Sequence, residues 1–309
     1  MDKVLITAVS FGQADPDPIR LLEQEHLSYV INPYGRRLRA EELAGIIGPY
    51  EVVIAATDPI TEAVLDAAPN LRLIARIGIG LDNVPLAATR ERGIAVTYTP
   101  DAPAAAVAEF TIGQMLALLR RTANADRGMR RGEWHRWVGR RVVGHLQSFH
   151  PMRILLNDVS IDEDFARSNR CIWTDRETIF READIITLHA PLTPQTRNMV
   201  GEQQLAMMKP DAILINTARG GIVNEAALVA ALRARTNFSA AVDVFVEEPY
   251  EGELTGLENC LLSCHMGSGT RDCRLRMEIE AAQEVVRYFR GDPFASPVPD
   301  AEYLMQVEG

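Results

Sequence analysis

The chain alternates short apolar runs with amphipathic helical stretches along most of its length. The first apolar run is KVLITAV, over residues 3–9, and the helical stretch PIRLLEQEH follows it. Short apolar runs bounded by turn residues suit buried strands, whereas apolar residues that recur every three or four positions indicate a helix. An alternation of strands and helices predicts an α/β protein whose parallel sheets are covered by helices on both faces.

The alternation occurs twice, which predicts two doubly wound parallel sheets. A long helix is expected between them, over about residues 104–121, because AAAVAEFTIGQMLALLRR has a broad apolar face and no proline. A last helix is expected over about 271–290, where Gly291 provides a C-cap and Pro293 prevents continuation. The predicted strands of the first sheet lie in 3–9, 28–32, 51–56, 72–78 and 94–99, and those of the second in 153–158, 184–192, 212–221, 239–245 and 260–265.

The composition excludes several classes of protein. The net charge of −10 argues against nucleic-acid binding, and no apolar run approaches the ~20 residues of a membrane span. The first residues lack the basic start and long apolar core of a signal peptide. Four cysteines are too few for a disulfide scaffold, so we expect a reducing, cytoplasmic setting. Cys260, Cys264, His265 and Cys273 lack paired zinc-ligand spacing, so no metal site is predicted.

Part of a dinucleotide-binding unit can be placed. Asp158 ends the predicted strand RILLND, where a carboxylate would bind the ribose hydroxyls of NAD; the alternative is a solvated loop aspartate. The first strand and Gly-x-Gly turn that should come before this strand are missing between residues 132 and 153, although Gly139 could be the last glycine of the turn. Gly78-Ile79-Gly80 has no third glycine in register and is better interpreted as a loop whose amides meet a substrate anion.

Three polar residues follow predicted strands of the second sheet. Arg219 precedes two glycines, and a guanidinium can bind a carboxylate through two hydrogen bonds. Glu248 follows VDVFV, and His265 follows CLLSC. Taken alone, Arg219 could be a surface arginine in a turn, and His265 could be a structural histidine. All three lie at the carboxyl ends of successive parallel strands, however, and ligands bind there in doubly wound sheets.

With these residues and motifs, the chain resembles the D-isomer-specific 2-hydroxyacid dehydrogenases, especially members similar to D-3-phosphoglycerate dehydrogenase. The resemblance covers nearly the whole sequence, and several stretches in the same order make it specific. The matching stretches are RIGIGLDNV, VAEFTIGQMLALLRR, GEWHR, ADIITLHAPLT, MMKPDAILINTARGGIVNEAAL, AAVDVFVEEP and LLSCHMGSGT.

The resemblance implies an NAD-dependent oxidoreductase that acts on a small D-2-hydroxy or 2-keto acid. Arg219 would bind the substrate carboxylate, His265 would be the general acid and base, and Glu248 would hold the imidazole. The amides around Ile77, Gly78 and Ile79 would also meet the carboxylate. The residues implied for NAD are Gly139, Asp158, Thr217, Ala218, Asp243 and Gly267.

The resemblance also implies a discontinuous flavodoxin-like substrate domain, residues 1–101 with 292–309, and a Rossmann-type NAD domain, residues 102–291. It further implies a homodimer. Two departures are mild: Cys264 stands where the family usually has proline, and Asn224 where it often has aspartate. The missing first strand and glycine loop are the serious departure. They leave open a non-catalytic family member that acts as a binding or scaffold protein, or a sequence from which a segment has been omitted.

Overall fold

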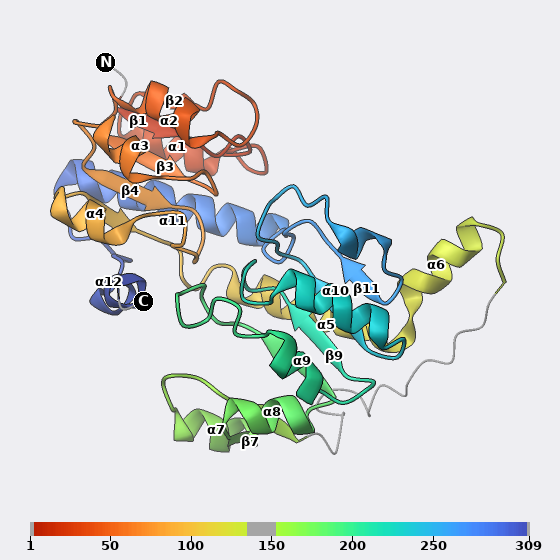
Figure 1. Cartoon of the computed structure of the whole chain (residues 1–309). Coiled ribbons are helices and arrows are strands. Elements are labelled where there is room, and N and C mark those ends of the chain that lie inside the picture. The colour runs from red at the N-terminus through yellow and green to blue at the C-terminus, as the bar shows by residue number, and fades with distance from the viewer. Residues whose placement is uncertain (1–2, 135–152, 308–309) are drawn as a thin grey trace. The chain divides into compact units, whose positions relative to one another are not determined.

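The computed structural model describes residues 3–134 and 153–307, and these divide into two compact units. The first unit comprises residues up to Val107 together with those from Ser268 onward, and the second runs from Ala108 to Gly267. The chain therefore leaves the first unit and returns to it (Figure 1). None of the helices formed by the described residues is long and apolar enough to cross a membrane.

The first unit contains a five-stranded parallel sheet in the order β2-β1-β3-β4-β5. Successive side chains of a strand enter cores on opposite faces: Leu5 belongs to one apolar cluster, and Val4 and Ile6 belong to the other. The strands are β1 (Val4–Ile6), β2 (Tyr29–Ile31), β3 (Val52–Ala55), β4 (Leu73–Arg76) and β5 (Ala95–Thr97). The helices are α1 (Asp17–Gln24), α2 (Ala40–Ile47), α3 (Glu62–Asp66), α4 (Leu86–Glu91), α11 (Arg271–Arg290) and α12 (Asp300–Val307).

Helix α11 belongs to the core of this first unit. Its residues Met277, Ala281 and Val285 pack in the same cluster as Val4 and Ile54 of the sheet, and Figure 1 shows the helix beside β4. It begins with the Thr270 side chain accepting a hydrogen bond from the Cys273 amide and ends at Gly291 with φ of 74°. The bounds predicted for this helix, including its glycine cap, are confirmed.

The second unit contains a four-stranded parallel sheet, β11-β10-β9-β8, and a separate two-stranded parallel sheet, β6-β7. Its strands are β6 (Ile154–Leu156), β7 (Cys171–Trp173), β8 (Ile185–Leu188), β9 (Ile213–Asn216), β10 (Ser239–Val242) and β11 (Cys260–Leu262). Its helices are α6 (Thr122–Arg130), α7 (Glu163–Asn169), α8 (Arg176–Glu182), α9 (Glu202–Met207), α10 (Glu225–Ala234) and the short 3₁₀ helix η1 (Glu253–Gly256). Helix α5 (Ala104–Arg120) begins in the first unit and lies mostly in the second.

Among the described residues, the two sheets are separated at the position that one further strand would fill. A doubly wound nucleotide domain has the strand order 3-2-1-4-5-6. If β6 and β7 are strands 2 and 3, and β8, β9 and β10 are strands 4, 5 and 6, strand 1 belongs between β6 and β8. Among residues 3–134 and 153–307, no strand pairs with that edge of β6 or with that edge of β8.

The segment in which the sequence lacks a first strand and glycine turn falls mostly within 135–152, outside the described residues. Gly139 lies in that range, and so does the helix face expected over 142–149. The α/β architecture with parallel sheets is confirmed by the described residues on both sides of it.

The helix predicted over about 104–121 is confirmed as α5, which spans Ala104–Arg120. Arg121 has φ of 51°, in the left-handed region, so α5 ends at Arg120 and α6 starts at Thr122. Sequence patterns did not predict the second helix, α6, that follows directly. Sequence patterns also missed β7, α7, α8 and α12, which are short and lack a fully apolar face.

Candidate active site

Arg219 is positioned by a turn at the carboxyl end of β9. The Asn216 side chain holds this turn, because its Nδ2 donates to the Arg219 carbonyl (3.0 Å) and its Oδ1 accepts from the Ala218 amide (3.2 Å). Gly220 allows the turn to touch the neighbouring loop: a Cβ there would come within 2.0 Å of the Phe245 carbonyl group. The half-buried Arg219 thus stands at the end of a strand whose four residues are fully packed in the core.

Asp243 follows β10 and organises the loop that carries His265. Its side chain is completely buried. Oδ1 accepts hydrogen bonds from Ser263 Oγ (2.6 Å) and the Met266 amide (2.8 Å), and Oδ2 accepts from the Gly267 amide (2.9 Å). The Asp243 carbonyl also accepts from the His265 amide at 2.7 Å. The loop from Ser263 to Gly267 is therefore built around one buried carboxylate. These hydrogen bonds replace the bonds to water that the carboxylate loses on burial.

His265 and Glu248 form the central pair of the site. Nδ1 of His265 lies 2.9 Å from Oε2 of Glu248, and Oε1 of Glu248 accepts from the Phe245 amide at 3.0 Å. The carboxylate accepts the Nδ1 proton, so Nε2 is the nitrogen left to exchange a proton with a ligand. The side chain of His265 is 36% exposed, and its backbone has φ of 55°. The histidine is thus held in one tautomer and remains open to solvent.

Helix α5 contacts two of these strand ends through polar groups that sequence reasoning missed. Thr111 Oγ1 lies 3.0 Å from Thr217 Oγ1, and Gln114 Nε2 donates to Ser263 Oγ at 2.9 Å. Thr111 and Gln114 are 5% and 4% exposed, one helical turn apart on the face toward the sheet. Two polar residues within an otherwise apolar helix face were the available signal.

The remaining residues assigned to NAD have different surroundings. Asp158, just after β6, is exposed and accepts only the local Ser160 amide (3.2 Å) among described groups, so its carboxylate is accessible to sugar hydroxyls. Thr217 is buried and Ala218 half-buried at the end of β9. The amide of Gly267 is bound to Asp243. Gly139, the remaining residue assigned to NAD, lies outside the described residues.

The loop proposed for the substrate carboxylate belongs to the first unit. The Ile77 amide donates to the Ala55 carbonyl (2.8 Å), and the Gly78 amide donates to Thr99 Oγ1 (2.8 Å). Two of the three predicted amides therefore already have partners within the unit, while Ile79 is 50% exposed. Gly78 has φ of 128°, a conformation that favours glycine.

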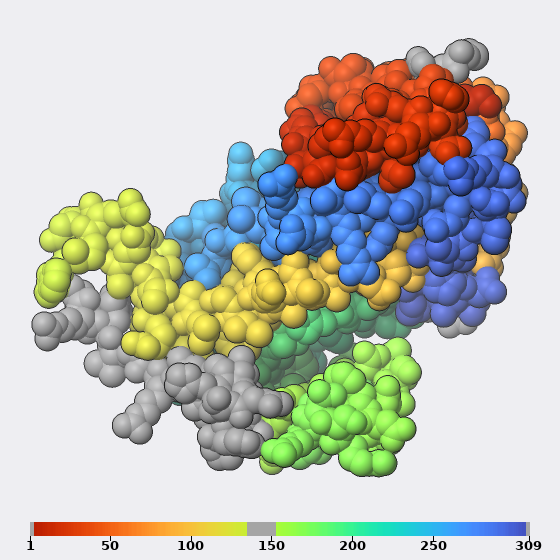
Figure 2. Space-filling view, turned by 180° about the vertical axis from the view of Figure 1, so that it is seen from behind, coloured from red at the N-terminus to blue at the C-terminus, as the bar shows by residue number. Residues whose placement is uncertain are grey.

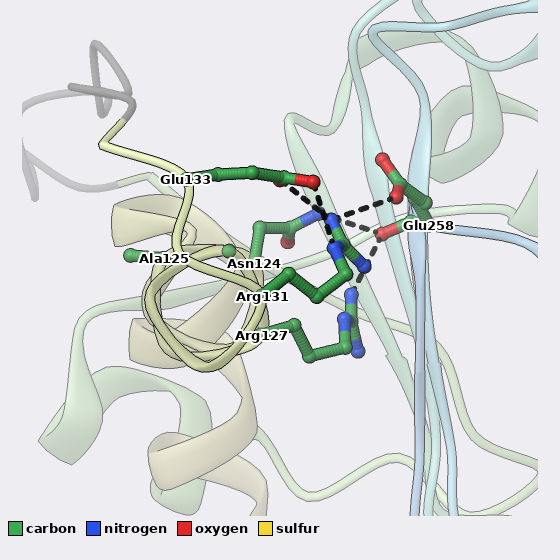
Figure 3. A pocket seen from close by; sticks show the side chains of 7 residues that line it. Asn124, Ala125, Arg127, Arg131, Glu133 and Glu258 are labelled. Atoms are coloured by element: carbon green, nitrogen blue, oxygen red, sulfur yellow. Dashed lines mark hydrogen bonds and ion pairs between the residues drawn. The ribbon is translucent and has the colours of Figure 1, made fainter.

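A small polar pocket in the second unit is a structural junction rather than a ligand site. Figure 3 shows that the side chains of Asn124, Arg127 and Arg131 converge on Glu258. The Glu258 carbonyl accepts from Asn124 Nδ2 (3.0 Å) and Arg127 Nη2 (3.3 Å), and Arg131 pairs with Glu133. The pocket has a volume of about 20 Å³, which holds about one water molecule. The cluster fixes α6 to the segment that enters β11.

The carboxyl ends of these parallel strands present an arginine, a buried aspartate and a histidine held by a glutamate, at the edge where doubly wound α/β sheets bind their ligands. The family model described as "D-isomer specific 2-hydroxyacid dehydrogenase, NAD binding domain" matches residues 137–267. A glyoxylate reductase of Aeropyrum pernix is 37% identical over 282 residues, which cover 79% of this chain and 84% of the relative. The chain belongs to the D-isomer specific 2-hydroxyacid dehydrogenase family.

The fold comparison agrees with this assignment. A solved structure of a protein from Thermus thermophilus has a TM-score of 0.84 and 30% identity, and the match covers 96% of this chain and all of that one. The structure of D-lactate dehydrogenase from Aquifex aeolicus, complexed with NAD and lactic acid, has a TM-score of 0.81 at 24% identity and supports the fold. The predicted family and its α/β fold are confirmed, and the part of the family that the model matches is described as its NAD binding domain.

Other relatives are longer than this chain. It spans 51% of a D-3-phosphoglycerate dehydrogenase from Synechocystis and 58% of one from Methanocaldococcus jannaschii, with 31% and 34% identity over 84% and 94% of this chain. The second alignment runs over 317 residues while using 94% of the 309 residues here. Part of that relative's aligned region therefore has no counterpart in this chain.

Proposed function

We propose that the chain is an NAD-dependent oxidoreductase that transfers hydride between nicotinamide and a small D-2-hydroxy or 2-keto acid. The observation that carries the proposal is the 2.9 Å contact between His265 Nδ1 and Glu248 Oε2, in the unit that also holds Arg219 and the buried Asp243. Reduction of a ketone requires a proton donor as well as a hydride, and a histidine with one fixed tautomer can supply the proton.

Each residue has a defined chemical role in this proposal. Arg219 binds the substrate carboxylate and polarises the keto oxygen through charge-assisted hydrogen bonds. His265 delivers a proton from Nε2 to that oxygen during reduction and removes it from the hydroxyl during oxidation. Glu248 accepts the Nδ1 proton and stabilises the imidazolium. NAD, when bound, supplies or accepts the hydride at the substrate carbon, so a keto acid, a hydride and a proton give one hydroxy acid.

The two units would divide the binding task. We assign NAD to the second unit, with Asp158 on the ribose and with Thr217, Ala218 and Asp243 toward the nicotinamide; Oδ2 of Asp243 has one further acceptor position beyond its bond from Gly267. The first unit, with the loop of Ile77, Gly78 and Ile79, would contact the substrate. These roles correspond to a substrate domain of residues 1–101 and 292–309 and an NAD domain of residues 102–291.

The names of the relatives indicate which substrates to test. The relatives are D-3-phosphoglycerate dehydrogenases, glyoxylate reductases and a hydroxypyruvate reductase. We therefore propose assays with glyoxylate and hydroxypyruvate in the presence of NADH, and with D-3-phosphoglycerate in the presence of NAD. Turnover that disappears in His265→Gln supports the proposal. Saturable NADH binding without turnover of any of the three would contradict it for these substrates.

A homodimer in the cytoplasm completes the proposal. Figure 2 shows α5 and α6 at the surface in that view. Three large apolar side chains of these helices and one just after α6 are exposed: Ile112 39%, Leu116 36%, Met129 55% and Trp134 76%. Apolar patches of this kind mark association surfaces. Light scattering of the purified chain gives its mass in solution and tests the dimer directly.

The separated sheets favour a second candidate, a family member that binds without catalysing. No strand among the described residues joins β6 to β8, and that position is where a nucleotide domain places the strand leading to its glycine loop. This candidate predicts no saturable change in NADH fluorescence. Intact mass spectrometry of the expressed protein, compared with 34.2 kDa, shows whether a segment is absent from the sequence or from the protein.

A further inference from the structure

We propose that Gln114 of α5 is a positioning residue that acts through Ser263 and Asp243 on the loop carrying His265. The inference rests on the proposed function only for its effect on turnover, because the positioning itself is a property of the protein without ligand. All of the residues involved belong to the second unit.

The direction of each hydrogen bond follows from the chemistry of the partners. Ser263 Oγ lies 2.6 Å from Asp243 Oδ1, and a carboxylate oxygen can only accept, so the hydroxyl proton points to Asp243. The same oxygen, Oγ of Ser263, lies 2.9 Å from Gln114 and must therefore accept there. This requires the amide nitrogen of Gln114, rather than its oxygen, to face Ser263. The chain of bonds runs in one direction, from Gln114 through Ser263 to Asp243.

This series of hydrogen bonds ends at the backbone around His265. Asp243 accepts the amides of Met266 and Gly267, the two residues that follow His265, and its own carbonyl accepts the His265 amide. A shift of the Asp243 carboxylate would therefore move Met266 and Gly267 directly, and His265 through its peptide bond to Met266. Because His265 has to meet Glu248 at one nitrogen and a ligand at the other, a small displacement of this loop changes proton transfer.

Stability alone does not explain a glutamine at this place. Gln114 is 4% exposed, and its Oε1 is buried without a hydrogen-bond partner among the described residues. An unsatisfied buried acceptor costs about 1–3 kcal/mol. Elsewhere the same helix buries apolar groups, since Met115 and Leu118 pack against Ile213 and Ile215 of the sheet. An apolar residue at 114 would satisfy the packing, so the polar group serves the bond to Ser263.

Thr111, one helical turn before Gln114, makes a similar polar contact with the end of a strand. Its hydroxyl lies 3.0 Å from that of Thr217, two residues before Arg219, and both are buried. Helix α5 thus makes one polar contact near the strand end that carries Arg219 and one near the loop that carries His265. This arrangement sets the two catalytic side chains against a common rigid element.

The decisive variant is Gln114→Glu, which keeps the shape and removes the donor. A glutamate at this position accepts a hydrogen bond from the Ser263 hydroxyl, which then no longer donates to Asp243. We expect hydrogen exchange of the Met266 and Gly267 amides to accelerate at least tenfold in the protein without ligand, and kcat to fall about tenfold with little change in the KM for NADH. Both effects should diminish on acidification, because a protonated glutamate can donate again. Rates are compared with those of the wild type at each pH.

Two further variants separate positioning from packing. Gln114→Met removes the bond without reversing it, and its thermal stability should equal or exceed that of the wild type while exchange at Met266 and Gly267 rises. In a Ser263→Ala background, Gln114→Glu should have little additional effect, since the intermediate hydroxyl is gone. Unchanged exchange at Met266 and Gly267 in Gln114→Glu overturns the inference. Faster exchange in Gln114→Glu, combined with a wild type that shows no turnover, supports the inference and contradicts the proposed function instead.

Discussion

The Nδ1 atom of His265 lies 2.9 Å from Oε2 of Glu248, although the two residues come from loops that follow different strands. Glu248 belongs to the loop after β10 and is fixed by the Phe245 amide, and His265 follows β11 and is fixed by Asp243. A parallel sheet brings these two loops to the same edge. The pair therefore depends on the packing of the second unit, and most of the following predictions concern that edge.

Replacement of Glu248 by glutamine should impair proton transfer while leaving the fold intact. Glutamine carries no charge to stabilise the imidazolium, and its amide can turn its nitrogen toward Nδ1. We expect kcat to fall about 10²-fold, a loss typical of removing one partner of a catalytic acid–base pair. Steady-state kinetics measures this, with Glu247→Gln as the control, because Glu247 is an exposed neighbour. Equal losses in both variants would contradict the role of Glu248.

Replacement of Arg219 by lysine should weaken substrate recognition more than cofactor binding. A lysine keeps the positive charge but cannot form two parallel hydrogen bonds to a carboxylate. We expect kcat/KM for the keto acid to fall about 10²-fold, which corresponds to about 3 kcal/mol of transition-state binding. Arg233→Lys is the control, because Arg233 forms an exposed pair with Glu253. An NADH affinity that falls as much as kcat/KM would place Arg219 outside the substrate site.

Gly220 should not tolerate a methyl group. An alanine Cβ would come within 2.0 Å of the Phe245 backbone, so the turn carrying Arg219 or the loop carrying Glu248 must move. We expect a loss of about 2–4 kcal/mol in unfolding free energy, as for other severe steric substitutions. Denaturant unfolding measures it, with Gly256→Ala as the control, because no atom lies within 4 Å of the corresponding Cβ. Equal stability of the two variants would show that the contact is not tight.

Restoring a strand and glycine turn should improve both stability and cofactor binding. The insert would consist of a short apolar strand followed by Gly-x-Gly-x-x, placed between Glu133 and Arg153. Such a strand can pair with the edges of β6 and β8 and bring backbone amides to the pyrophosphate. We expect a higher melting temperature and at least tenfold tighter NADH binding by fluorescence titration. A glycine–serine insert of equal length is the control, and the same gain from both would contradict strand pairing.

Glu278 of α11 should make the first unit less stable as pH rises. Burial raises the pKa of Glu278 above its ordinary value of 4.5, against the opposing effects of the Gly12 amide and Arg274. The folded state therefore binds the proton more tightly than the unfolded state, and its stability falls as pH increases from about 4.5 through the folded-state pKa.

Glu278→Gln lacks this titration and keeps an acceptor for the Gly12 amide, which now lies 2.9 Å from Oε2. Relative to the variant, the wild type should lose unfolding free energy between pH 4 and pH 8 in urea titrations. Glu280→Gln, two residues along the same helix, is the control, because Glu280 is partly exposed and pairs with Arg276. A constant difference between wild type and Glu278→Gln would contradict the prediction.

The sequence by itself determined the class of fold and the family. Alternating apolar runs and helical stretches predict parallel α/β sheets because strands buried on both faces must be apolar throughout. Local signals also located α11, including its cap at Gly291. Arg219, Glu248 and His265 could be selected because they follow strands, and parallel strands bring their carboxyl ends to one edge.

Only the tertiary structure decided how those residues are held. The burial of Asp243 beneath the His265 loop and the contact of Gln114 with Ser263 join segments far apart in the sequence. No local pattern encodes them, because the direction of a buried hydrogen bond depends on which partners the packing brings within reach. The same holds for the separation of β6-β7 from β8: the sequence indicates a missing strand, and the structure leaves one edge of β6 and one edge of β8 unpaired among the described residues.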